Sequence, residues 1–300
     1  MGARRTCVDS HLLPEEAAAV DRRPGMNMNL IQESTIARAW LRGCEYLLER
    51  GGSEYTLILG VSDPLLVTPG DRAVERLVNS FLVAHGAFPI HTVAETIFPG
   101  SAYRHHGADG VYNVYPDEIY PALKIRRHPD FRWGTYAYRM LRRTRDGEPY
   151  SPLQECVKKM RDAAPKHACY EIDLPTDVPT YDDTVDGKKR MGLPCLSLVS
   201  FKIMPEHRLQ LTALYRHHYY IAKTFGNLLG LARLQQFVAI EAGLRVGPLV
   251  CHSTLGRLEV EHSRDQHWSM RDVKELLSSC RTQYSSAADA PPHSLAPADT

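Results

Sequence analysis

Five stretches of the chain repeat apolar residues at the spacing of an amphipathic helix. In the first, Ile36 and Trp40 lie on one face, and Ser34 stands where a helix N-cap is expected. In the last, Ser269 and Asp272 have the spacing of a capping box. The expected helices cover about residues 34–51, 69–86, 153–163, 226–244 and 269–277.

Three other stretches have the pattern of β-strands. The segments YTLILGV (55–61) and LVCHSTL (249–255) are short, mostly apolar runs. Between residues 195 and 216, apolar and polar positions alternate on both sides of a turn at Pro205-Glu206, which predicts a β-hairpin. Helices and strands follow one another along the body, so we expect an α+β protein with a mixed sheet packed by helices.

The two ends of the chain lack this periodicity. Residues 1–27 are polar and charged, and residues 283–300 are rich in Ala, Pro and Ser. We expect both to be disordered tails around one folded domain, residues 28–282, which is long enough for a large core.

Composition narrows the class of protein. The formal net charge is +1, so no strongly basic surface for nucleic acid is implied. The basic and aromatic run KIRRHPDFRW (124–133) is better interpreted as a solvated loop or a cleft lining. No run of about 18 apolar residues is present, and the N-terminus has no secretory pattern. The 7 cysteines are scattered without a CxxC pair, which favours reduced thiols and a cytoplasmic location.

One ordered set of residues carries a family pattern. Pro194-Cys195 is followed by a strand, a turn, a second strand ending at Arg216, and Asn227 at the start of a long helix. This order resembles the thymidylate synthases and pyrimidine hydroxymethylases, most closely the archaeal, methanogen-type branch, over about residues 30–265. The blocks TYAYRMLRR (135–143) and GPLVCHSTLGRLE (247–259) share the resemblance. It implies a thymidylate synthase-like mixed sheet, a homodimer formed through that sheet, and 5,10-methylenetetrahydrofolate as cofactor.

The resemblance assigns Cys195 as the nucleophile. C5 of a pyrimidine is a poor nucleophile until a thiolate adds to C6 and gives C5 carbanion character. The thiol then needs a lowered pKa, which a nearby cation such as Arg216 can supply. A free cysteine considered alone is more often a small core residue.

The resemblance also assigns basic residues to the nucleotide phosphate. Arg216 suits this task because a guanidinium binds phosphate oxygens bidentately, although a solvated charge at a strand end is the alternative. His217 takes the place of a serine that contacts the phosphate in the family. Lys166 and His167 stand where the family has two arginines that reach the phosphate from the partner subunit.

Asn227 matches the asparagine that reads the base. A carboxamide donates to O4 and accepts from N3–H of uracil, whereas relatives that use cytosine tend to carry aspartate, so Asn227 favours uracil. Asn is also a common helix N-cap, and the two roles are compatible.

Two further residues are implied near the thiol. Glu95 resembles the glutamate that moves protons at O4, with a surface carboxylate as the alternative. Tyr136 resembles a tyrosine that lies beside the cysteine, with an aromatic core position as the alternative.

The sequence departs from the family at substrate and folate contacts. The aspartate that faces folate is replaced by Tyr219, and the sugar-binding His-x-Tyr is replaced by Arg257-Leu258-Glu259. Glu259 can accept hydrogen bonds from sugar hydroxyls and Arg257 can bind an added anion, which suggests an altered sugar preference. Methylation and hydroxymethylation of a uracil or cytosine nucleotide stay open.

Two other classes were weighed against this one. A non-catalytic protein that keeps the fold, binds a nucleotide or acts as a dimeric interaction module is the main alternative, because of these departures. A metal site is disfavoured, since the adjacent pairs His105-His106 and His217-His218 point to opposite faces of a strand.

Overall fold

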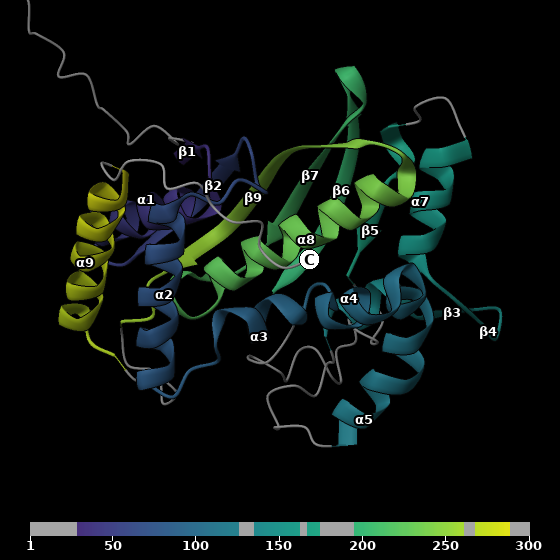
Figure 1. Ribbon diagram of the computed structural model, residues 1–300, viewed down its shortest axis with the longest axis horizontal. Coiled ribbons are helices and arrows are strands. Elements are labelled where there is room, and N and C mark those ends of the chain that lie inside the picture. The colour runs from purple at the N-terminus through teal and green to yellow at the C-terminus, as the bar shows by residue number, and fades with distance from the viewer. Residues whose placement is uncertain (1–28, 126–134, 163–166, 175–194, 261–267, 289–300) are drawn as a thin grey trace, which may run out of the picture.

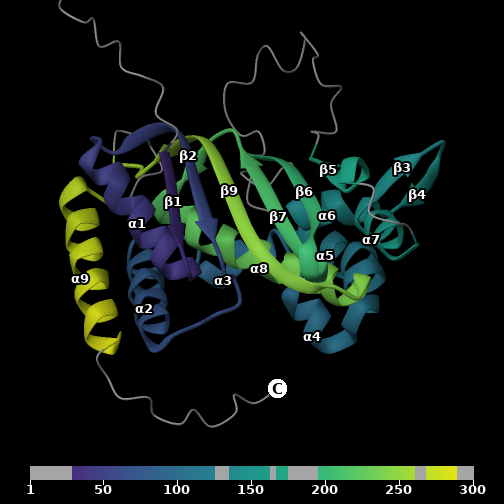
Figure 2. The same ribbon diagram turned by 90° about the horizontal axis from the view of Figure 1, so that it is seen from above.

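A mixed β-sheet forms the centre of the computed structural model, which describes residues 29–125, 135–162, 167–174, 195–260 and 268–288. In these residues the strand order is β1-β2-β9-β7-β6-β5, and Figure 2 shows the strands in this sequence from one edge to the other. β8 pairs with β9 beyond the end of β7. The strands are β1 (Asn29–Glu33), β2 (Ser53–Val61), β5 (Glu171–Asp173), β6 (Leu196–Met204), β7 (Arg208–Tyr215), β8 (His218–Tyr219) and β9 (Arg245–Arg257).

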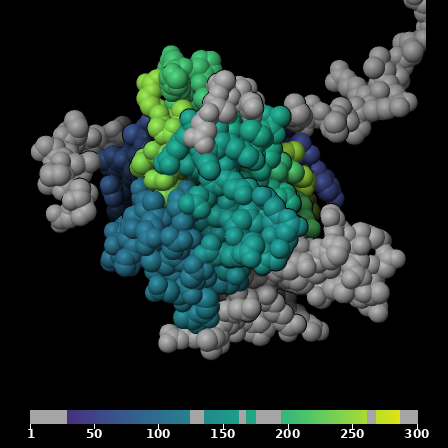
Figure 3. All heavy atoms as spheres, turned by 90° about the vertical axis from the view of Figure 1, so that its right-hand side faces the viewer, coloured from purple at the N-terminus to yellow at the C-terminus, as the bar shows by residue number. Residues whose placement is uncertain are grey.

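Helices cover one face of this sheet and both of its ends. Figure 1 shows α8 crossing the sheet, α2 and α9 side by side at one end, and α4, α5 and α7 at the other. Figure 3 looks at that second end, where atoms coloured blue to teal form the surface. The α-helices are α1 (Ile36–Glu49), α2 (Pro69–Ala84), α3 (Ile90–Glu95), α4 (Gly100–Asp109), α5 (Tyr120–Ile125), α6 (Tyr136–Leu141), α7 (Pro152–Asp162), α8 (Phe225–Ala242) and α9 (Met270–Ala288). Shorter elements are the π-helices η1 (Gly110–Ile119) and η5 (Tyr220–Thr224), the 3₁₀ turns η3 (His167–Cys169) and η4 (Pro205–His207), and the hairpin β3 (Arg143–Arg145) and β4 (Glu148–Tyr150).

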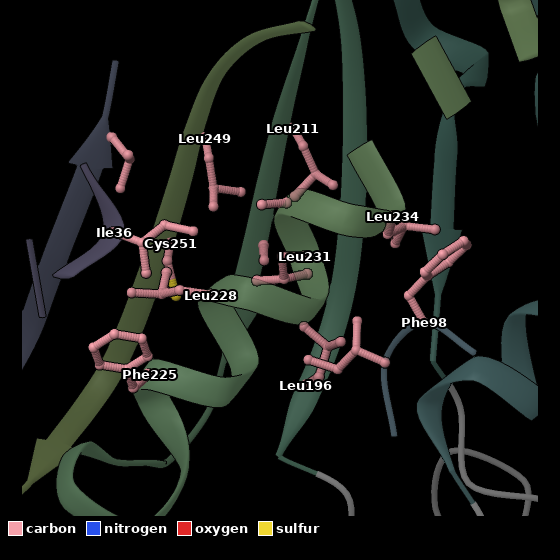
Figure 4. Packing of buried hydrophobic residues seen from close by; sticks show 14 of the residues in the cluster. Ile36, Phe98, Leu196, Leu211, Phe225, Leu228, Leu231, Leu234, Leu249 and Cys251 are labelled. Carbon is pink, nitrogen blue, oxygen red and sulfur yellow. The ribbon is translucent and has the colours of Figure 1, made fainter. Parts of the chain in front are cut away.

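The core lies between α8 and the sheet. Leu228 and Leu231 point from α8 toward Leu211, Leu249 and Cys251 of the central strands, and all five side chains are fully buried (Figure 4). Because β7 alternates strictly between buried and half-buried residues, its other side chains point to the opposite face of the sheet.

Two glycines let α3 lie directly against the start of α8. A Cβ at Gly226 would lie 2.6 Å from the carbonyl oxygen of Ile90, and one at Gly230 would lie 2.7 Å from that of Ala94. Any side chain at either position would push the two helices apart. These contacts fix the distance between α3 and the first turn of α8, which carries Asn227.

The structure confirms the expected mixed sheet and its main helices, with some differences. Thr35, not Ser34, caps α1, because the Thr35 hydroxyl accepts the N–H of Arg38. α9 begins at the predicted capping box but runs through Ala288, into the segment expected to be a tail. β1 and the short helices between α2 and α7 were not expected. Within the described residues, no helix is both long enough and apolar enough to cross a membrane.

Candidate active site

The β6–β7 hairpin brings Cys195 and Arg216 together. Cys195 precedes β6 and Arg216 follows β7, and the backbone N–H of Arg216 donates to the carbonyl of Cys195 at 3.0 Å. The hydroxyl of Tyr136, on the first turn of α6, accepts the N–H of Cys195 at 3.1 Å and that of Leu196 at 3.4 Å. Three residues that the sequence places far apart therefore meet at one end of the hairpin.

The Cys195 thiol is half-buried, and burial raises its pKa above the ordinary value. The positive charges of Arg216 and then Lys223 oppose this effect without overcoming it. The expectation of a lowered pKa is thus wrong for the protein without ligands, because desolvation of the thiolate outweighs the two cations.

Lys223 is a residue that the sequence analysis missed. It lies on η5, one helical turn before Asn227, and its ammonium group stands 4.9 Å from the ring centre of Phe88. The i, i+4 spacing to Asn227 was visible in the sequence and would have identified it as a neighbour of the site.

Asn227 is buried in the first turn of α8, three residues after the N-cap position Thr224. The proposed cap role is therefore wrong, and the carboxamide has another partner. Its Nδ2 lies 2.9 Å from Nε2 of His218, a histidine that is itself 1 % exposed.

His217 and Arg257 lie near one another at the ends of β7 and β9. Burial lowers the pKa of His217, and the charge of Arg257 lowers it further. Nε2 of His217 is buried and has no hydrogen-bond partner among the described residues. Tyr219, opposite Arg257 in the β8–β9 pairing, places its ring 4.6 Å from that of His217.

The carboxylate of Glu259 forms hydrogen bonds with the protein's own backbone. Its two oxygens accept the backbone N–H groups of Ile221 at 3.1 Å and Ala222 at 2.9 Å, so it holds the start of η5. Burial raises the pKa of Glu259 to about 8, although these N–H groups and Lys223 act in the opposite direction. This placement differs from the sugar contact expected from the sequence.

Glu95 is engaged between α3, α4 and α8. Both of its oxygens accept the N–H of Ser101, at 3.1 and 3.2 Å, and Arg233 lies 3.8 Å away. The next residue, Thr96, accepts the N–H of Ala137, so the backbone beside Glu95 supports the helix that carries Tyr136.

The predicted contacts from a partner subunit are only partly within the described chain. Lys166 lies outside the described residues, and His167 begins η3. Pro194, directly before the cysteine, also lies outside them.

Three curated proteins that are similar to this chain in sequence carry the same name. Over 239 residues the chain is 24% identical to a "Putative thymidylate synthase" of Methanococcoides burtonii, covering 80% of this chain and 91% of that protein. Shorter matches reach 42% identity over 74 residues in Methanothermobacter marburgensis and 37% over 101 residues in Methanothermobacter thermautotrophicus, both with the same name. These two matches cover 25% and 34% of this chain, and 32% and 41% of the two relatives. Each match therefore spans less than half the length of the relative.

No family model matches the chain. Among solved structures, thermostable thymidylate synthase A from Bacillus subtilis aligns with a TM-score of 0.48 and 11% identity, covering 82% of this chain and 84% of that one. The sequence matches agree with the resemblance seen in the motifs: the chain is similar to methanogen proteins named putative thymidylate synthase.

Proposed function

We propose that this protein transfers a one-carbon group to C5 of a pyrimidine nucleotide through a covalent bond from Cys195. The observation that carries the proposal is the position of the half-buried thiol: Tyr136 anchors its backbone, while Arg216 and Lys223 both act on its charge. A core cysteine needs no such surroundings.

The thiolate has a defined task in this chemistry. Sγ adds to C6, the C5–C6 π electrons move toward the C4 carbonyl, and C5 becomes nucleophilic enough to attack an activated carbon. The C5 proton and the group that carried the carbon are then lost, hydride or water adds to the exocyclic methylene group, and expulsion of Sγ restores the C5–C6 double bond. A thiolate suits both steps because it is a good nucleophile and a good leaving group.

Basic side chains fit the phosphate of the nucleotide. Arg216 is exposed at the end of β7, and His217, Lys223 and Arg257 come from the segments beside it. Nε2 of His217, which has no hydrogen-bond partner in the described part of the chain, could donate to a phosphate oxygen as a serine hydroxyl does. Two oxygens of a bound phosphate would accept hydrogen bonds from the Arg216 guanidinium. We propose that Lys166 and His167 of a second subunit also contact this phosphate.

The base is assigned to Asn227 and proton movement to Glu95. Asn227 presents the donor and acceptor that match uracil. Glu95 keeps its proposed role at O4, although Ser101 and Arg233 already contact it. Any water-mediated step would have to use its remaining lone pairs.

Methylenetetrahydrofolate is the proposed donor, and it would supply the carbon that C5 accepts. The residues toward folate do not match the family, because Tyr219 presents a phenol beside His217 where a carboxylate is expected. We therefore derive no step through the folate from this site.

A homodimer through the open face of the sheet is part of the proposal. Five side chains stand in direct register across neighbouring strands on the face opposite α8: Leu30, Ile58, His252, Leu214 and Leu198. Four of them are aliphatic, all are exposed or half-buried, and Leu30 is 54 % exposed. An apolar row of this kind is typical of an interface.

We also place the protein in the cytoplasm. The six cysteines within the described residues are all free, as expected where thiols are kept reduced.

The test is release of tritium from C5. Purified protein is incubated with 5-tritiated dUMP, UMP, dCMP and CMP, with and without methylenetetrahydrofolate. We expect folate-dependent release from one uracil nucleotide, loss to background in Cys195→Ala, and wild-type release in Cys169→Ala. Cys169 is a matched control because it is also a partly exposed free cysteine.

The alternative is a non-catalytic protein of the same fold that binds a nucleotide or serves as a dimeric interaction module. The replacement of the folate-facing carboxylate by Tyr219 and the use of Glu259 by the backbone favour it. Nucleotide binding without tritium release from any of the four substrates would support this alternative and contradict the enzyme.

A further inference from the structure

A buried chain of polar groups stands behind Asn227. Nε2 of His218 lies 2.9 Å from Nδ2 of Asn227, and Nδ1 of the same ring lies 3.0 Å from the hydroxyl of Ser253. The hydroxyl of Tyr220 lies 3.2 Å from that of Ser253. His218, Ser253 and Asn227 are 1 %, 0 % and 5 % exposed, so these groups satisfy one another in place of water.

Packing holds the imidazole of His218 in one orientation. The ring of Tyr215 stacks on it at 3.9 Å with an angle of 2° between the planes, and Tyr220 contacts it edge-on at 5.5 Å. Its backbone is paired with Gly256 in the β8–β9 ladder. The ring therefore offers its two nitrogens in fixed directions, one toward Asn227 and one toward Ser253.

The hydrogen-bond partners define the proton on this ring. Burial lowers the pKa of His218 to about 3, so the imidazole is neutral near pH 7. An N–H of Asn227 donates to Nε2, which must then be the unprotonated nitrogen. The single ring proton lies on Nδ1, where the Ser253 oxygen accepts it.

This arrangement fixes which way the amide of Asn227 faces. Nδ2 is the amide atom that faces His218, so Oδ1 and the second N–H are left for a ligand. That edge accepts from a ring N3–H and donates to a C4 carbonyl, as in uracil. With the amide reversed, a donor would face N3 and an acceptor would face C4, which suits cytosine.

We propose that His218 is a positioning residue that makes the site specific for a 4-oxo pyrimidine by holding the Asn227 carboxamide in one of its two orientations. The inference rests on the proposed function, since it assumes that Asn227 reads the base. Its direct structural content, the Nδ1–H form of His218 and the bond to Asn227, is independent of catalysis.

The first experiment observes the ring proton. Full-length protein with ¹⁵N-labelled histidine is examined by two-bond ¹H–¹⁵N correlation spectra between pH 6 and 8, and His218→Phe identifies the signal. We expect a neutral ring with the proton on Nδ1 throughout. A proton on Nε2, or a ring that titrates in this range, would overturn the proposal.

The second experiment measures discrimination between bases. Binding of dUMP and dCMP, and of UMP and CMP, is compared by calorimetry, and tritium release is measured in parallel. His218→Phe keeps an aromatic ring but removes the acceptor, so we expect the preference for dUMP over dCMP to fall by about tenfold or more, the usual worth of a bidentate base contact. Tyr215→Phe, which removes only a hydroxyl without a partner among the described residues, should keep the preference.

A conservative variant separates orientation from packing. His218→Gln restores a carbonyl acceptor, so part of the lost discrimination should return. An unchanged ratio in His218→Phe would refute the role of His218. If wild-type protein binds none of dUMP, dCMP, UMP and CMP, the proposed function fails and the base-reading role with it, while the spectra still decide whether His218 holds Asn227.

Discussion

At the scale of single residues, the thiol of Cys195 responds to two opposing influences. Burial raises its pKa, while Arg216 and Lys223 lower it. A raised pKa leaves the thiol mainly protonated at neutral pH, which slows its oxidation and alkylation.

This balance predicts the pH dependence of Cys195 alkylation. The rate with iodoacetamide should be low at pH 7 and keep rising through pH 9, since only the thiolate reacts. Lys223→Met keeps an apolar chain but removes a charge that lowers the pKa, so its profile should move to higher pH. Mass spectrometry of the Cys195 peptide reports the rate.

The matched control is Lys158→Met, an exposed lysine on α7. It should leave the profile in place. A Lys223→Met profile that coincides with that of wild type would show that this lysine has no influence on the thiol.

At the scale of elements, α8 has two tasks that meet in its first turns. Its apolar residues fill the core against the sheet, and its glycines give α3 close access (Figure 4). Asn227 lies between Gly226 and Gly230, so the same close approach that packs the two helices sets the position of the Asn227 amide. A change at either glycine should affect both stability and binding.

We predict that Gly230→Ala destabilises the protein. Alanine is favoured over glycine within a helix by about 1 kcal/mol, but its Cβ would meet the Ala94 carbonyl at 2.7 Å. Overpacking of this kind typically costs about 1–3 kcal/mol, so a net loss of up to about 2 kcal/mol is expected in urea unfolding.

Ile240→Ala is the comparison on the same helix, because Ile240 is 55 % exposed. Its effect should stay within about 0.5 kcal/mol, as for ordinary surface substitutions. Equal stability of Gly230→Ala and wild type would mean that α3 can move away from α8 freely.

At the scale of the whole molecule, the two faces of the sheet differ. α1 and α8 pack on one face, and the other carries the registered row from Leu30 to Leu198. A second copy covering this row would remove the apolar side chains from water, and a stable interface of this kind buries about 800 Å² on each partner. The proposed phosphate contacts from a second subunit require the same assembly.

Leu214→Glu should therefore convert a dimer to a monomer. Leu214 is the fourth member of the row and is half-buried, so a charge there opposes association more than folding. Size-exclusion chromatography with light scattering gives the mass, and circular dichroism checks that the fold is kept.

Val83→Glu introduces the same charge on α2, where Val83 is 54 % exposed, and should leave the mass unchanged. The predicted interface on the sheet face would be wrong if the wild-type protein is monomeric at micromolar concentration, or if the Leu214→Glu variant has the mass of a dimer.

The sequence by itself determined the long elements and the order of the reactive residues. The hairpin of β6 and β7, the helix α8 and the capping box of α9 follow from local periodicity, which depends only on neighbouring residues. β1 and α3 did not follow, since β1 pairs with β2 and α3 packs against α8, both distant along the chain. The family resemblance identified Cys195, Arg216 and Asn227 because their order and spacing can be read directly along the sequence.

Only the tertiary structure decided what each of these groups meets. Burial reverses the expected direction of the Cys195 pKa, and Lys223 joins the site through the turn before α8. Glu259 faces the backbone of η5, and His218 holds Asn227. Desolvation and hydrogen-bond direction depend on groups that are distant along the chain and adjacent in space, so no local pattern can specify them.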